Sequence, residues 1–340
     1  MFFIPNKFLF FCMLVGSTIF TISSNSWLGA WMGLEINLLS FIPLMSNTKN
    51  IFSTEASLKY FLTQAFASST LIFFILLSFL IYLNYYSFYM NDSMKMLILS
   101  SLFLKLGAAP FHFWFPSVAE NLTWLMNLIL LTWQKIAPMI LISYINNNIY
   151  MQFIAIFSTL IGSLGGLNQT NLRKIMAFSS INHIGWMISS LIMNNNLWKT
   201  YFLIYSLLTI LMISIFMNFN LFYINQIYLM MNFNLMNKFL LFMNFLSLGG
   251  LPPFLGFFPK WMIINNLILN DYFFLLTIMS VLTLINLFFY LRLALNSFLL
   301  LNMEQKWFIK INFKMNYFLI MMSTISLLSL PLFTLLYFIF

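Results

Sequence analysis

Residues 105–116 read KLGAAPFHFWFP, and residues 248–259 read LGGLPPFLGFFP. Each stretch carries a glycine, a proline, two phenylalanines and a second proline at the same intervals. Because proline lacks an amide donor and clashes with the carbonyl about four residues earlier, such a stretch interrupts a helix. The sequence therefore predicts two broken helices, with the interruptions at Gly107, Pro110, Gly250, Pro252 and Pro253.

The composition predicts a membrane protein. Of the 340 residues, 62% are hydrophobic and 6% are charged, and the mean hydropathy is +0.94. Soluble domains have about 25% charged residues, and about 20 apolar residues span a bilayer. Residues 1–340 are therefore expected to form a single all-α polytopic transmembrane domain of about eleven helices. The predicted spans are 8–23, 26–45, 57–83, 94–115, 122–143, 149–167, 174–193, 198–223, 238–269, 273–298 and 315–340.

The two broken segments lie in the fourth and ninth predicted spans. Equivalent helices that are an odd number of spans apart cross the membrane in opposite directions, which is typical of an inverted-topology repeat. We therefore expect inverted five-helix repeats at 8–143 and 149–298, followed by a C-terminal helix at 315–340. The alternative is that the Gly-Pro clusters only kink the helices for packing.

Basic residues predict the orientation. With the N-terminus inside, ten basic residues fall on the inner side, and only Lys95 and Lys199 fall on the outer side. Positive charge accumulates on the inner side of membrane proteins. The N-terminus is therefore expected on the matrix side if the membrane is mitochondrial. Residues 1–6 lead directly into the first span, without the pattern of a cleavable signal peptide.

Residue usage indicates the kind of genome. Phe occurs 43 times and Met 25 times, whereas Gly occurs 11 times and arginine only at Arg173 and Arg292. Residues with A/T-rich codons have displaced those with G/C-rich codons, and abundant methionine is typical of a mitochondrial genetic code. We expect a mitochondrial gene, with an A/T-rich bacterium as the alternative.

Cysteine and histidine usage argues against redox centres in this chain. Cys12 is the single cysteine, and His112 and His183 are the two histidines. An iron–sulfur cluster needs about four ligands, and the histidines are too few for a two-haem cytochrome. A Gly-rich phosphate loop is also missing from the sequence. We therefore expect no metal and no cofactor in this chain.

Buried charges are the candidate site. Glu35, Lys105 and Lys135 lie deep within predicted spans, and Lys260 follows a helix break. Each charge at the centre of a membrane helix costs about 2.5 to 3.5 kcal/mol unless it is paired or hydrated. We expect an ion pair between Glu35 and Lys105, and a water chain lined by Lys135 and Lys260, so that the row passes protons. The alternative is a static ion pair that holds helices together.

The two histidines are possible proton relays. His183 lies among small polar residues that could hold water, and His112 lies just after a proline break. Histidine exchanges protons near neutral pH, but either ring could equally make an ordinary hydrogen bond between helices.

Five motifs resemble a known family. The chain resembles the NADH dehydrogenase subunit 2 family of mitochondrial respiratory complex I, and its insect members in particular. The motifs that carry the resemblance are GLEIN at 33–37, KLGAAPFH at 105–112, WQK at 133–135, GLPPF at 250–254 and PKW at 259–261. The similarity covers essentially the whole chain, although bacterial members begin with three further helices that this sequence lacks.

The resemblance implies a non-redox, antiporter-like subunit of the membrane arm, in the mitochondrial inner membrane. In that family the residues matching Glu35 and Lys105 form a pair, the lysine matching Lys135 is central, and the one matching Lys260 is near an exit. NADH, FMN, iron–sulfur clusters and ubiquinone would belong to other subunits. The implied partners are neighbouring membrane-arm subunits and phospholipids, with no nucleic acid. An independent cation/proton antiporter and a purely structural subunit are the alternatives.

Overall fold

The computed structural model describes residues 5–47, 50–85, 92–145, 147–230, 235–299 and 323–324. The predicted C-terminal helix at 315–340 lies outside these residues except for 323 and 324. The chain divides into two compact units, Met1–Ile154 and Ala155–Phe340, and helix α8 (Asn148–Gly166) crosses the boundary between them. Apart from an isolated bridge between Asn171 and Tyr223, the regular structure of the described residues is helical.

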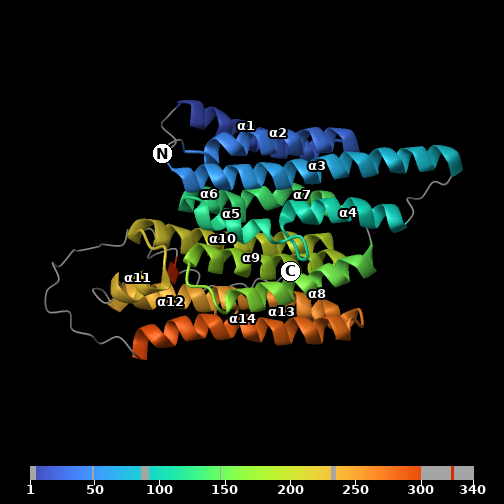
Figure 1. The fold of residues 1–340 in the computed structure, drawn as a ribbon. Coiled ribbons are helices and arrows are strands. Elements are labelled where there is room, and N and C mark those ends of the chain that lie inside the picture. The colour runs from blue at the N-terminus through green and yellow to red at the C-terminus, as the bar shows by residue number, and fades with distance from the viewer. Residues whose placement is uncertain are drawn as a thin grey trace. The chain divides into compact units, whose positions relative to one another are not determined.

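Among its described residues, the first unit contains seven complete helices, which are coloured blue to green in Figure 1. Helices α1, α2 and α3 pack against one another in chain order, α3 also contacts α4 and α5, and α7 contacts α1, α4 and α6. The bounds are α1 (Pro5–Ser23), α2 (Trp27–Met45), α3 (Ile51–Tyr85), α4 (Asp92–Leu106), α5 (Trp114–Asn121), α6 (Trp124–Leu131) and α7 (Trp133–Ser143).

The second unit is built around α9, whose residues are almost all buried. Helices α10 and α13 contact α9, while α12 and α14 pack on each other. Small residues let the helices approach closely: an added Cβ on Gly162 of α8 would lie 2.6 Å from the backbone nitrogen of Asn182. The bounds are α9 (Leu172–Met193), α10 (Asn195–Phe219), α11 (Ile224–Met230), α12 (Leu235–Gly249), α13 (Phe257–Leu269) and α14 (Phe273–Leu299).

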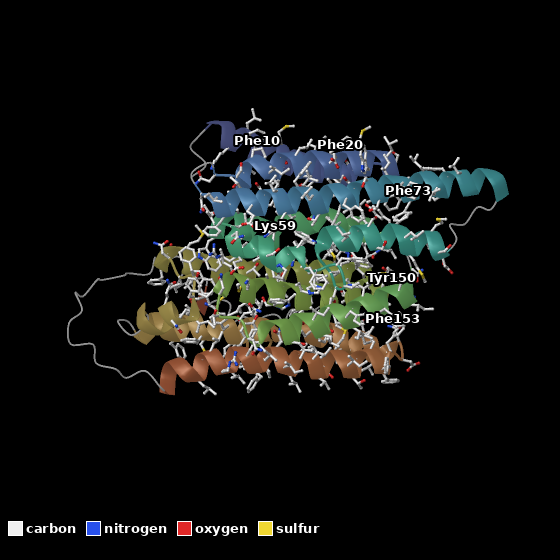
Figure 2. The ribbon with its side chains drawn as sticks, viewed as in Figure 1. Phe10, Phe20, Lys59, Phe73, Tyr150 and Phe153 are labelled. Carbon is white, nitrogen blue, oxygen red and sulfur yellow. The ribbon has the colours of Figure 1, made fainter. Side chains whose placement is uncertain are left out.

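The helices have the lengths and surfaces of membrane spans. Within the described residues, seven segments are long and apolar enough to cross a bilayer. Many exposed side chains are large and apolar, as for Phe20 on α1 and Phe73 on α3, which are 47% and 56% exposed and are labelled in Figure 2. A helical chain with apolar side chains on its surface is stable in lipid, where backbone groups must bond internally. The protein is therefore a multi-pass helical membrane protein.

The span expected at 122–143 is confirmed as the apolar segment Trp124–Ser143. It contains one irregularity that the sequence did not predict, because α6 ends at Leu131 and α7 begins at Trp133. Thr132 between them has φ −114° and ψ −70°, and its hydroxyl donates to the Leu128 carbonyl. Gln134 and Lys135, at the start of α7, therefore lie within one helical turn of the irregular backbone at Thr132.

Candidate functional site

The first helix break ends α4 at Leu106. Gly107 has a φ of +72°, a conformation that glycine adopts readily. The Gly107 amide donates to the Leu104 carbonyl at 3.2 Å, and the Ala108 amide donates to the Phe103 carbonyl at 3.1 Å. This pair of bonds is a Schellman motif, which satisfies carbonyls at the end of a helix. The peptide bond before Pro110 is cis, and the chain becomes helical again at Trp114.

The second break has the same local structure 143 residues later. Gly250 has a φ of +83°, its amide donates to Ser247, and the Leu251 amide donates to Leu246. The peptide bond before Pro253 is cis, α12 ends at Gly249 and α13 begins at Phe257. Each of these residues lies 143 positions after its counterpart in the first break. The repeat in the sequence is therefore also a repeat in backbone conformation.

Side chains satisfy the carbonyls that surround the breaks. In the first unit, Gln64 donates to the Lys105 carbonyl at 3.2 Å and the Trp114 indole donates to the Leu104 carbonyl at 3.1 Å. In the second unit, the Lys260 ammonium donates to the Gly249 carbonyl at 2.6 Å. A Cβ on Gly250 would lie 2.8 Å from that ammonium nitrogen. Gly250 thus provides both the unusual φ and the room for Lys260.

The first unit contains a cavity that brings Lys105 and Lys135 together. Its volume is about 20 Å³, which exceeds the roughly 10 to 15 Å³ that one water molecule needs. Lys105 is 7% exposed and Lys135 is 1% exposed. The lining residues are Leu34, Asn37, Leu38, Tyr60, Gln64, Lys105, Leu106, Trp114, Phe115, Leu130, Gln134, Lys135 and Pro138. Two groups that can carry a proton therefore share a water-sized space away from bulk water.

Polar side chains that sequence reasoning missed also line this cavity. The Tyr60 hydroxyl lies 3.5 Å from the side-chain oxygen Oε1 of Gln134, and the side-chain amide of Gln64 donates to the Lys105 backbone carbonyl. In the described part of the chain, the Oδ1 of Asn37 and the Nε2 of Gln134 are buried without a hydrogen-bond partner. One is an acceptor and the other a donor, so a single water could satisfy both. Gln134 immediately precedes Lys135, which was the available signal in the sequence.

The predicted ion pair between Glu35 and Lys105 is wrong. The structure has surface ion pairs between Lys59 and Glu55 and between Lys95 and Asp92, but no contact ion pair between Glu35 and Lys105 in the part of the chain that it describes. Glu35 acts on Lys105 electrostatically from a longer distance, and within the described residues its Oε2 is buried without a hydrogen-bond partner.

Lys135 has a contact that the sequence did not reveal. Its ammonium nitrogen lies 5.6 Å from the centre of the Phe115 ring. Such a cation–π contact stabilises a buried ammonium ion, by about 2 kcal/mol or more when the pair is desolvated. Phe115 is the second residue of α5, directly after the first helix break, so the end of the break positions an aromatic face beside the central lysine.

The two histidines lie in different surroundings. The Nδ1 of His183 on α9 lies 2.8 Å from the hydroxyl of Tyr201 on α10, and its ring lies 4.9 Å from that of Tyr205. His112 lies within the first break, with Nδ1 3.2 Å from the Pro110 carbonyl and its ring 4.3 Å from Phe113. His112 is not among the residues that line the cavity. The spacing of Tyr201 and Tyr205, four residues apart on one helix, was a signal in the sequence that went unused.

The family model for the NADH:quinone oxidoreductase/Mrp antiporter transmembrane region matches residues 24–286. NADH-ubiquinone oxidoreductase chain 2 of Anopheles gambiae is 57% identical over 94% of this chain and 92% of the relative. The same chain of Aedes aegypti is 54% identical over 97% of both.

Solved structures share the fold at lower identity. A chain of respiratory complex I from Thermus thermophilus gives a TM-score of 0.81 at 22% identity, over 96% of this chain and 79% of that one. A chain of the Mrp complex from Dietzia sp. gives 0.73 at 15% identity, over 85% and 59%. On the family model and the similarity to the insect relatives, this chain belongs to the NADH:quinone oxidoreductase/Mrp antiporter family, among its NADH-ubiquinone oxidoreductase chain 2 members.

Proposed function

We propose that this chain is a proton-translocating subunit of the membrane arm of respiratory complex I, without redox chemistry of its own. The observation that carries the proposal is the water-sized cavity shared by Lys105 and Lys135 beside a broken helix. The names of the insect relatives supply the coupling to NADH oxidation and ubiquinone reduction. NADH, FMN, iron–sulfur clusters and ubiquinone then act in other subunits, and the neighbours of this chain are other antiporter-like subunits and phospholipids.

Electrostatics gives the two lysines a way to exchange a proton. A positive charge on Lys105 repels a positive charge on Lys135, and repulsion is stronger in a poorly hydrated interior than in water. The carboxylate of Glu35 attracts the charge on Lys105. A change at Glu35 therefore shifts the balance between the lysines, and water in the shared cavity supplies the path. The Phe115 ring holds the ammonium form of Lys135 at the end of this step.

The remaining site residues extend the path. Lys260 lies at the second break, bonded to a carbonyl that the interrupted helix leaves free, and we assign it an exit role. His183 is assigned a relay role in the second unit. His112 is the other relay candidate, and its Nδ1 lies 3.2 Å from the Pro110 carbonyl within the first break.

The proposal includes the full topology. It places about eleven spans in the mitochondrial inner membrane, with inverted repeats at 8–143 and 149–298, a C-terminal helix at 315–340 and the N-terminus in the matrix. The equal backbone conformation of the two breaks supports the repeat. The excess of basic residues on one side, ten against two, supports the orientation.

A charge exchange separates the proton path from a structural role. In the assembled complex, the double variant Glu35→Lys with Lys105→Glu is expected to lower proton translocation per NADH oxidised, with the step through this chain slowed about tenfold or more. The exchange keeps the two charges but removes the amine from the cavity. Normal proton translocation by the double variant would favour a purely structural role for Glu35 and Lys105.

The antiporter alternative predicts activity in isolation. The chain purified into liposomes is expected to show no cation/proton exchange above that of empty liposomes, because the proposed path is driven by the rest of the complex. Exchange of Na⁺ or K⁺ for protons, measured with a pH-sensitive dye under an imposed cation gradient, would contradict this assignment.

A further inference from the structure

Three tyrosines of the second unit are buried and have no part in the function described above. Tyr201, Tyr205 and Tyr290 are 1%, 2% and 0% exposed. Burying a hydroxyl without a hydrogen bond costs about 1 to 3 kcal/mol in proteins, and a phenylalanine of nearly the same shape avoids this cost. Tyrosine at all three positions therefore indicates a use for the hydroxyls.

The three hydroxyls gather along one turn of α9. The Tyr201 hydroxyl lies 2.8 Å from Nδ1 of His183, and the Tyr205 hydroxyl bonds to the side chain of Ser180. The Tyr290 hydroxyl, from α14, faces the side chain of Ser179 but makes no hydrogen bond of ordinary geometry to any described residue. Each tyrosine also interacts electrostatically with at least one of the other two.

The serines are placed to accept hydrogen bonds from these tyrosines. Ser179 donates its own hydroxyl hydrogen to the Met176 carbonyl at 2.8 Å, and Ser180 donates to the Ala177 carbonyl at 2.7 Å. A hydroxyl has one hydrogen to donate and two lone pairs that can accept. The serine oxygens therefore remain available as acceptors that orient the hydroxyls of Tyr205 and Tyr290.

The cluster reaches the surroundings of Lys260 through Tyr290. A Cβ placed on Gly249 would lie 3.3 Å from the Tyr290 ring, so this ring packs directly on the end of α12. The Gly249 carbonyl is the group that accepts the hydrogen bond from the Lys260 ammonium at 2.6 Å. The tyrosines thus occupy the region between the histidine of α9 and the lysine of the second break.

We propose that Tyr201, Tyr205 and Tyr290 form a hydroxyl relay that conducts protons between His183 and Lys260. The proposal rests on the proposed function, because it requires that His183 and Lys260 carry protons. Packing alone is the competing role, since Tyr290 also contacts Phe245 and Phe289 with ring centres 5.6 Å and 4.2 Å away. A packing role needs the rings and not the hydroxyl groups.

The chemistry of the relay is balanced at every step. A neutral imidazole accepts the Tyr201 hydrogen at Nδ1, and an imidazolium donates its hydrogen to the Tyr201 oxygen, so one hydrogen bond persists in both charge states. When Tyr201 passes its hydrogen to Nδ1, its oxygen takes a hydrogen from Tyr205, Tyr205 takes one from Tyr290, and Tyr290 takes one, through water, from the Lys260 ammonium, which becomes a neutral amine. Each hydroxyl ends with one hydrogen, no tyrosinate accumulates, and the net result is the transfer of one proton.

The test compares hydroxyl deletions in the assembled complex. Tyr201→Phe and Tyr290→Phe each remove one oxygen and keep the ring, and Tyr223→Phe is the matched control because Tyr223 is 50% exposed. Proton translocation is measured per NADH oxidised, so a lower yield of complex leaves the value unchanged. Loss of one hydrogen bond, worth about 0.5 to 1.5 kcal/mol, corresponds to a roughly two- to tenfold slower proton step. We expect this slowing for Tyr201→Phe and Tyr290→Phe and none for Tyr223→Phe.

The pH profile of translocation separates a relay from packing. The relay predicts that Tyr201→Phe shifts the pH profile of translocation, because the hydroxyl bonds directly to His183. The titratable groups facing this region are Tyr201 and Tyr205 of α10, Tyr290 of α14 and Lys260 of α13, and the two deletions leave the lysine in place.

The Lys135→Met variant is measured in the same experiment, because it distinguishes failure of the tyrosine relay from failure of the proposed function. Normal translocation and an unchanged pH profile in both Tyr201→Phe and Tyr290→Phe, alongside impaired Lys135→Met, would overturn the relay and leave the proposed function intact. Normal translocation in all three variants would overturn both.

Discussion

Replacing Lys135 by methionine is expected to stop proton passage through this chain while the complex still assembles. Methionine has a similar length and no charge, and Lys135 is 1% exposed, so the substitution fills the same space. It also removes the cost of a buried charge, about 2.5 to 3.5 kcal/mol on insertion scales. A missing acid–base group slows a proton-transfer step by about 10²-fold or more. The expected result is fewer protons translocated per NADH oxidised, measured by quenching of a pH-sensitive dye in proteoliposomes.

Lys199→Met is the matched control, because Lys199 is an exposed lysine on α10. The same change of residue type at the surface should leave both assembly and proton translocation unchanged. If Lys135→Met assembles normally and translocates as many protons as Lys199→Met, the cavity between Lys105 and Lys135 does not carry protons.

Replacing Gly256 by alanine is expected to prevent the second break from forming. A Cβ at this position would lie 1.7 Å from the Ser247 carbonyl oxygen and 2.8 Å from its carbon, and both are backbone atoms that cannot rotate away. Overpacking typically costs about 1 to 3 kcal/mol, and we expect the upper end or more here because α12 and α13 would have to separate. The measurement is the amount of assembled complex on a native gel, with its thermal midpoint.

The space around Gly256, and not its backbone conformation, decides this outcome. Its φ is −65°, which alanine adopts without strain. Gly16→Ala on α1 is the matched control, since no atom lies within 4 Å of a Cβ placed there. Assembly of Gly256→Ala at the level of Gly16→Ala would show that the tight contact between the break and Ser247 is not needed.

The helix breaks were predictable because glycine and proline act on the backbone itself. A missing amide donor at Pro110 and Pro253 interrupts a helix in any environment, and Gly107 and Gly250 allow the turn that ends it. The depth of the lysines was predictable for a similar reason, since hydropathy depends on composition over about 20 residues. Both kinds of prediction need only local information.

Side-chain partners were not predictable, because they depend on how helices pack. Attraction between opposite charges favoured an ion pair between Glu35 and Lys105, but the structure places a longer-range interaction there. The same limit applied to Phe115 beside Lys135 and to Tyr201 beside His183, where the partners are distant in the chain. The break at Thr132 was missed because threonine occurs in many continuous helices and carries no signal comparable to proline.

The central claim is that this chain works as part of an NADH-oxidising complex. The most direct test is to solubilise the membrane gently, separate it on a native gel with in-gel NADH oxidation, and locate the chain by mass spectrometry. We predict that the chain migrates with a very large band that oxidises NADH. Migration as a small species without NADH oxidation, from intact membranes, would contradict the account and favour an independent antiporter.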